Sequence, residues 1–191
     1  RRNFSRCRSV VLVMRFPIRV RPLFLLAAVL LAACSPTAAV ASSNQVAILG
    51  DDAHVLANPA GTLATLKSLG VGVVRLTLHW NDIAPASTSL KEPKGFAGIA
   101  NAPQAYSAAA WAPYDAVVND ARADGIAVDI VISGYAPLWA RNAGAPVSGT
   151  YLGSWYPSAT AYGQFVEAVG LRYPGVHFWE IWNEENWGPS L

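Results

Sequence analysis

The sequence predicts an α/β fold, a (β/α)8 TIM barrel truncated after strand four, on the basis of three observations. Strand-like and helix-like segments alternate four times between Gln45 and Trp182. The strand-like segments are nearly uninterrupted apolar runs, which is typical of parallel strands covered by helices. The helix-to-strand connections are short glycine turns, whereas two strand-to-helix connections are long. Such long loops lie at the carboxyl ends of the strands, where these folds carry their sites.

Each element follows from its own pattern. Aliphatic runs predict four strands, and apolar residues at helical spacing predict the helices between them. Asn58-Pro59 begins the first helix and Gly70 ends it, as capping residues commonly do. The predicted strands are residues 46–49, 73–80, 126–132 and 176–182, and the other helices are 114–123 and 158–172. The helix residues predicted to face inward are Leu63, Leu66, Leu69, Phe165, Val169 and Tyr173.

The two long loops are residues 81–113 and 134–157, with 33 and 24 residues. Loops beyond about 12–15 residues are usually functional or disordered. The second loop is rich in aromatic rings, which stack well on the apolar faces of sugars. The alternative is that these rings only hold the loop in place. They are Tyr135, Trp139, Tyr151, Trp155 and Tyr156.

The motifs and the length favour part of a barrel over an open nucleotide-binding sheet. No G-x-G-x-x-G or G-x-x-x-x-G-K-[ST] motif follows the first strand, which leads instead into Asp51-Asp52. A complete barrel needs at least about 200 residues. Residues 45–191 supply 147, with four strands. We therefore expect this region to be the N-terminal half of a barrel.

The first 44 residues are predicted to direct export. An 11-residue apolar run, Leu23–Ala33, follows Arg15, Arg19 and Arg21, and it is too short for the ~20 residues that span a bilayer. We divide this region into an upstream extension (1–13), a signal peptide (14–33) and a tether (34–44). Leu31-Ala32-Ala33-Cys34 resembles the lipobox of bacterial lipoproteins, which implies a lipid anchor on Cys34 and a place in the cell envelope. The alternative is cleavage after Ala41 and secretion.

Charge and cysteine content exclude several classes of protein. Seven of the 14 Lys and Arg residues lie in the first 33 positions, and the remainder has seven bases against 12 acids, a net charge of −5. Such a mildly acidic body argues against a nucleic-acid partner. The two cysteines, Cys7 and Cys34, exclude a zinc finger or a disulfide framework. We predict no metal site and no cofactor.

The most informative stretch is H-F-W-E-I-W-N-E-E-N, residues 177–186. It places Asn183 and Glu184 at the carboxyl tip of the fourth strand, where barrels keep their chemistry. Trp179 and Trp182 are expected to surround the Glu184 carboxyl with low-polarity surface, which disfavours its anion and suits a general acid. The Asn183 amide can hold a sugar hydroxyl.

This stretch resembles the W-E-x-W-N-E-P-N segment of retaining glycoside hydrolases of clan A, especially families 39 and 5. Residues 73–85 are similar to the second strand of these barrels, with its inward Arg and its W-x-x-I-x-P exit, and residues 132–140 to their G-x-x-P-x-W-A third-strand exit. The resemblance spans residues 46–187. It implies a barrel in which Glu184 is the acid/base and Asn183 orients the substrate, with Arg75 near a nucleophilic Glu on strand seven.

His79, Tyr135, Trp139 and Trp182 are candidate substrate-binding residues, although His79 could instead cap its strand. Glu185 replaces the usual Pro after the Asn-Glu pair and is expected to face solvent. Two further carboxylates, Glu180 and Asp129, are predicted to be interior and paired, Glu180 with Arg75 or another base. Asp51 and Asp52, at the end of the first strand, are expected to begin a turn or to contact a sugar.

We therefore predict a glycosidase acting on β-linked oligo- or polysaccharides by the retaining two-carboxylate mechanism. No carboxylate after Glu184 other than its neighbour Glu185 is present to act as nucleophile, so the chain by itself is expected to be inactive. One alternative is a lipid-anchored, non-catalytic carbohydrate-binding barrel. Another is a transglycosylase that uses the same residues.

Overall fold

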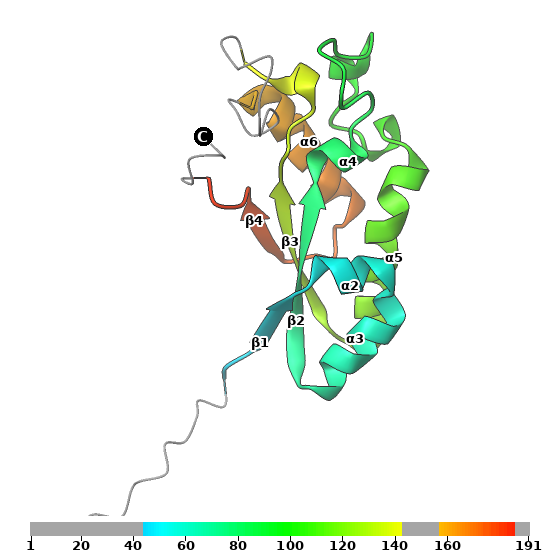
Figure 1. The fold of residues 1–191 in the computed structure, drawn as a ribbon, viewed down its shortest axis with the longest axis vertical. Coiled ribbons are helices and arrows are strands. Elements are labelled where there is room, and N and C mark those ends of the chain that lie inside the picture. The colour runs from blue at the N-terminus through cyan, green and yellow to red at the C-terminus, as the bar shows by residue number, and fades with distance from the viewer. Residues whose placement is uncertain (1–43, 143–156, 186–191) are drawn as a thin grey trace, which may run out of the picture. The chain divides into compact units, whose positions relative to one another are not determined.

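The structure, a computed structural model, describes residues 44–142 and 157–185. They form one parallel sheet with the strands in chain order, which confirms the predicted α/β fold (Figure 1). The predictions for the export region, including those for Cys7 and Cys34, lie outside the described residues. The four strands are β1 (Ala47–Gly50), β2 (Val71–His79), β3 (Ala127–Ser133) and β4 (Phe178–Ile181).

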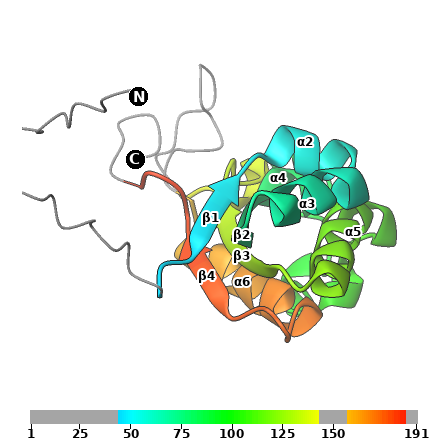
Figure 2. The same ribbon diagram turned by 90° about the horizontal axis from the view of Figure 1, so that it is seen from below.

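The helices gather on one side of the sheet and leave the other side open (Figure 2). Five α-helices are described: α2 (Asp52–Ala57), α3 (Pro59–Ser68), α4 (Trp80–Ile83), α5 (Ala108–Asp124) and α6 (Ala159–Arg172). Three short 3-10 turns lie in the loops: η1 (Phe96–Gly98), η2 (Pro103–Ala105) and η3 (Leu138–Ala140).

The two faces of the sheet differ in polarity. Because side chains alternate along a strand, Val74, Leu76 and Leu78 of β2 point to the helices and are fully buried. Arg75 and its odd-numbered neighbours point to the open face. The register aligns Arg75 with Asp129 of β3, and Val131 of β3 with Glu180 of β4. Charged side chains from three adjacent strands are thereby brought onto the open face.

Stacked aromatic rings form the centre of the core between the sheet and the helices. Phe165 of α6 lies between two indoles, stacked 5.5 Å from Trp80 and 6.3 Å from Trp111. The predicted inward face of this helix is confirmed, since Phe165, Val169 and Tyr173 are all buried. The prediction for Leu69 is wrong: α3 ends at Ser68, and Leu69 is 72% exposed in the turn that follows.

The loop predicted over residues 81–113 is not one irregular segment. It contains most of α4, then η1 and η2, and α5 begins at Ala108 rather than after Pro113. Ser107 caps α5 by accepting a hydrogen bond from the Ala110 N–H. The buried Trp111 ring donates to the Pro103 carbonyl oxygen. A cap and a buried anchor outweigh the loss of one backbone donor at Pro113, which lies near the N-terminal end of the helix.

The helix α2 is a second difference from prediction, since Asp51 and Asp52 were expected to begin a turn or to contact a sugar. Asp51 instead caps α2, its carboxylate accepting a hydrogen bond from the His54 N–H at 3.2 Å. The Oδ1 atom of Asp52 accepts a hydrogen bond from the Thr77 N–H at 2.9 Å.

The described part of the chain has no helix long and apolar enough to cross a membrane.

Candidate functional site

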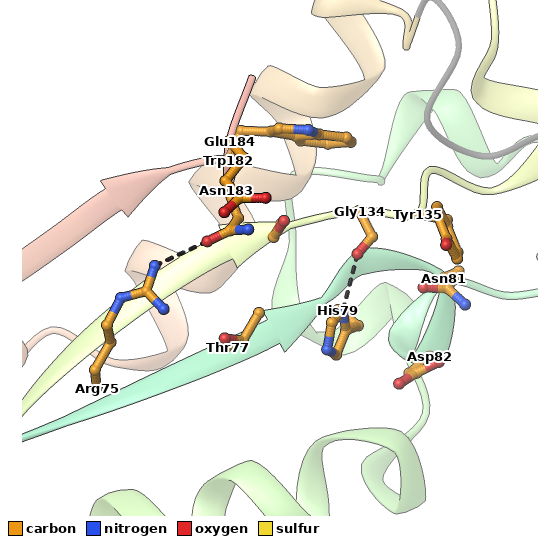
Figure 3. Close-up of a pocket in the computed structure, with 11 residues that line it drawn as sticks. Arg75, Thr77, His79, Asn81, Asp82, Gly134, Tyr135, Trp182, Asn183 and Glu184 are labelled. Carbon is orange, nitrogen blue, oxygen red and sulfur yellow. Dashed lines mark hydrogen bonds between the residues drawn. The ribbon is translucent and has the colours of Figure 1, made fainter. Parts of the chain in front are cut away.

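A pocket of about 550 Å³ opens at the carboxyl ends of β2, β3 and β4 (Figure 3). This is the edge of the sheet that the strand order predicts for a site. Six of the seven predicted catalytic and substrate-binding residues line it. They are Arg75, His79, Tyr135, Trp182, Asn183 and Glu184.

Five further lining residues were not predicted: Thr77, Asn81, Asp82, Ser133 and Gly134. A simple signal was available for most of them. Residues of β2 that share strand parity with Arg75 point to the same open face of the sheet. Residues that directly follow β2 and β3 lie at the carboxyl edge of the sheet. The polar pair Asn81-Asp82 follows β2 after a single residue, and the Asn81 N–H donates to the Tyr135 carbonyl oxygen at 3.0 Å.

Arg75 links two of the functional segments. Its Nε and Nη2 donate to the two carboxylate oxygens of Glu180 at 2.9 and 2.8 Å. Nη2 also donates to Oδ1 of Asn183 at 3.1 Å. The pairing predicted for Glu180 is therefore confirmed. These hydrogen bonds lower the pKa of Glu180 and raise that of Arg75.

Asp129 lies beside this pair without an arginine of its own. It is 9% exposed, and its Oδ1 has no hydrogen-bond partner in the described structure. Burial, followed by the contact with Glu180, raises the pKa of Asp129. The prediction that Asp129 is buried is confirmed. Its partner is the carboxyl group of Glu180 and not a base, because Arg75 donates its hydrogen bonds to Glu180 and Asn183.

The end of β4 turns sharply at the Asn-Glu pair. Trp182 and Glu184 have φ angles of 65° and 50°, a left-handed conformation that costs free energy in residues other than glycine. Glu184 is exposed at the mouth of the pocket, and Glu185 is exposed outside its lining, as expected. The expected pair of indoles around Glu184 is only half present. Trp182, just after β4, lines the pocket, but Trp179 does not. Within β4, Trp179 alternates with Glu180 and therefore points to the opposite face of the sheet.

The Trp182 indole lies in a tight slot. It packs edge to face against Tyr162 at 5.4 Å, and the Trp182 N–H donates to the Ile132 carbonyl oxygen at 2.9 Å. A Cβ atom at Gly134 would lie 2.6 Å from two of its ring carbons. Glycine at position 134 is therefore what lets the ring lie against the end of β3.

We expect Gly134→Ala to displace the Trp182 ring and to lower the free energy of unfolding by about 1–3 kcal/mol, as overpacking commonly does. Urea unfolding and tryptophan fluorescence would measure the two effects. The control is Gly170→Ala in α6, where an added Cβ meets nothing within 4 Å. That change should be neutral or stabilising by up to about 1 kcal/mol. An unperturbed fluorescence spectrum in Gly134→Ala would contradict the tight slot.

His79 is oriented by two contacts. Its Nδ1 lies 2.8 Å from the Gly134 carbonyl oxygen, which can only accept, so Nδ1 carries the proton. Its backbone N–H donates to the hydroxyl of Tyr114 at 3.3 Å. Nε2 is therefore the ring nitrogen left to meet a ligand. His79 lines the pocket, as its interpretation as a substrate-binding residue requires.

Trp139 does not line the pocket. Its ring packs edge-on against Trp80 at 6.2 Å and Phe96 at 5.4 Å, and its Nε1 donates to the Pro85 carbonyl oxygen at 2.9 Å. For this ring the alternative is correct, because it holds the two long loops together. Tyr135, by contrast, is 45% exposed and lines the pocket. Tyr151, Trp155 and Tyr156 lie outside the described residues.

Within residues 44–142 and 157–185, no group of three or more His, Cys, Asp or Glu side chains is arranged to hold a metal ion. The arrangement that is present consists of hydrogen-bond donors and acceptors around one ring face. Trp182 supplies the ring, Asn183, His79 and Asn81 supply polar groups, and Arg75, Asp82 and Glu184 supply charged ones. Hydrogen-bonding groups beside an aromatic ring suit a hydroxyl-rich ligand.

No protein-family model and no curated protein sequence matches the chain. Solved structures do match. Fpglu1 from Fervidobacterium pennivoraus is 18% identical with a TM-score of 0.51, and the match covers 68% of this chain and 29% of that one. The β-glucosidase from Trichoderma harzianum and β-glucosidase 2 from Trichoderma reesei, in complex with Tris, are each 20% identical. Their TM-scores are 0.48 and 0.47, with 68% of this chain and 24% of those chains covered.

The chain thus spans about a quarter of the length of the structures it resembles. The similarity to the Fervidobacterium structure is a similarity of fold. The described residues have the α/β architecture of part of a (β/α)8 barrel, as the sequence predicted.

Proposed function

We propose that the pocket binds a β-linked oligo- or polysaccharide and that the protein is a glycoside hydrolase with Glu184 as its acid/base. One observation carries the proposal: Asn183 and Glu184 lie together in a pocket at the carboxyl edge of the sheet, beside the Trp182 ring and the polar side chains of His79 and Asn81. The resemblance of residues 177–186 to clan A hydrolases supports the same assignment.

In this proposal the sugar stacks on Trp182, and Asn183 and His79 donate or accept hydrogen bonds to its hydroxyl groups. Glu184 gives a proton to the departing glycosidic oxygen and later takes one from water. A retaining mechanism also needs a nucleophilic carboxylate about 5–5.5 Å from the acid/base.

Neither of the other carboxylates nearest to the pocket suits the role of nucleophile. Glu180 accepts both hydrogen bonds from Arg75. Asp82 lies at the opposite end of the pocket from Glu184 (Figure 3). We assign the nucleophile to a carboxylate outside the described residues, in keeping with the strand-seven Glu that the resemblance implies.

A non-catalytic carbohydrate-binding protein is the second candidate. The exposure of Glu184 and the absence of a facing carboxylate among the described residues favour it. Incubating the full-length protein with aryl β-glycosides separates the candidates, since only an enzyme releases the aryl group. Elongated products in place of free sugar would identify a transglycosylase.

Removing the aromatic face should weaken binding in either case. We expect Trp182→Ala to lower the affinity for a β-linked oligosaccharide about ten- to a hundredfold, because an indole buries a large apolar area against the ligand. Isothermal titration calorimetry would measure this change. The matched control is Trp179→Ala, which removes an indole from the other face of β4 and should leave affinity unchanged. Equal loss in both variants would contradict the assignment of the binding face.

We also propose that the protein is exported and anchored by lipid on Cys34. The apolar run 23–33 and the Leu-Ala-Ala-Cys sequence that ends it support this proposal. Labelling cells with a radioactive fatty acid would test it. Label lost in Cys34→Ala supports the anchor, and an unlabelled wild-type protein beginning after Ala41 would instead support secretion.

A further inference from the structure

Four side chains form a connected row on the open face of the sheet, leading from its interior to the pocket. Asp129 of β3 contacts Glu180 of β4, Glu180 accepts two hydrogen bonds from Arg75 of β2, and Arg75 donates a third to Asn183. Figure 3 shows the last link, from the Arg75 guanidinium to the Asn183 side chain.

A proton on one of the two carboxyl groups, Asp129 or Glu180, stabilises the contact between them. An ionised carboxylate can only accept hydrogen bonds, so two ionised carboxylates side by side repel each other. Glu180 has both oxygens bound to the Arg75 guanidinium, whereas Asp129 is 9% exposed and has an oxygen without a partner. Losing the charge therefore costs less at Asp129 than at Glu180.

We propose that Asp129 and Glu180 share one proton at neutral pH, held on Asp129, and that the pair is a positioning unit for the pocket. Ionised Glu180 fixes the Arg75 guanidinium, and Arg75 fixes the Oδ1 end of Asn183. The Asn183 NH2 group is then the end left for a ligand. Through this row the unit makes Asn183 a donor toward a sugar oxygen, an inference that rests on the proposed function.

The charges around Asp129 agree with this placement of the proton. Arg75 faces it from β2 and Glu180 from β4, and Asp52 at the start of α2 adds a more distant negative charge near Arg75. Burial raises the pKa of Asp129, and Arg75 lowers that of Glu180. As pH rises through the raised pKa, Asp129 ionises and two carboxylates compete for one guanidinium. The folded state then loses stability that it has at lower pH.

The test uses the full-length protein with ¹³C-labelled carboxyl groups. We expect the Asp129 signal to remain in its protonated position at about pH 7, where exposed carboxylates are ionised. Asp129→Asn mimics the protonated acid, so it should fold and should lessen the loss of thermal stability at higher pH. A wild-type Asp129 signal that titrates together with those of exposed carboxylates would overturn the proposal.

The positioning role has separate readouts. Glu180→Gln should shift the ¹⁵N signals of the Asn183 side-chain amide and weaken oligosaccharide binding about tenfold. The matched control is Asp115→Asn, which breaks a similar pair with Arg172 on the helix side of the sheet and should change neither. Unshifted Asn183 signals in Glu180→Gln would overturn the positioning role. If the wild-type protein binds no sugar, the proposed function fails, while the carboxyl titration and the Asn183 signals still decide this inference.

Discussion

Glu184→Gln is expected to lower the turnover of unactivated β-glycosides by the full-length protein about a hundred- to ten-thousandfold. Gln keeps the shape and polarity of the side chain but cannot donate a proton to the leaving oxygen, and a positioned general acid contributes about that factor. Affinity for the oligosaccharide should change little, because Trp182, Asn183 and His79 still line the pocket. Steady-state kinetics together with calorimetry would separate the two effects.

Substrates with different leaving groups distinguish the loss of the general acid from a general loss of folded, active protein. An activated dinitrophenyl glycoside needs no proton to depart, so the step that cleaves it should suffer much less in Glu184→Gln. Glu185→Gln is the control, since this neighbouring carboxylate is exposed outside the pocket lining. Turnover of both substrates unchanged in Glu184→Gln, or equally reduced in Glu185→Gln, would exclude the assignment of Glu184.

Phe165→Ala is expected to lower the free energy of unfolding by about 3–5 kcal/mol, the cost of removing a buried aromatic ring and leaving a cavity. Phe165 is fully buried between Trp80 and Trp111, and both contacts are lost together. Chemical unfolding followed by circular dichroism would measure the change. A loss of this size is a large fraction of the free energy of unfolding of an ordinary domain.

Leu171→Ala provides the control on the same helix. Leu171 is 61% exposed, so its truncation should change stability by no more than about 0.5 kcal/mol. A comparable loss in the two variants would show that α6 is sensitive along its whole length and would contradict the aromatic stack as the centre of the core.

Local patterns were sufficient for most of the fold. The aliphatic runs located all four strands to within a few residues, and the inward face of α6 followed from the spacing of Phe165, Val169 and Tyr173. Patterns failed where short-range capping decided the outcome. The helix α2 depends on the Asp51 cap, and the first turns of α5 depend on Ser107 and on the burial of Trp111.

The candidate site divides in the same way. Strand ends place Glu184, Asn183, Arg75 and His79 at one edge of the sheet, so the motif and the parallel topology predict their proximity. Aromatic composition alone does not tell a ring that meets a ligand from one that meets other rings. Trp139 and Trp182 have the same chemistry, but Trp139 packs on Trp80 and Phe96 while Trp182 borders the pocket.

The order of apolar and polar residues along the chain, by itself, determined the parallel sheet and the edge at which polar side chains collect, since strand alternation and chain direction are local properties. Only the tertiary structure decided which charges meet. Three adjacent strands bring together Arg75, Asp129 and Glu180, of which the first and last are 105 residues apart along the chain. One guanidinium can satisfy only one carboxylate completely. Which carboxylate keeps its charge is therefore set by burial and distance, two quantities that no linear pattern contains.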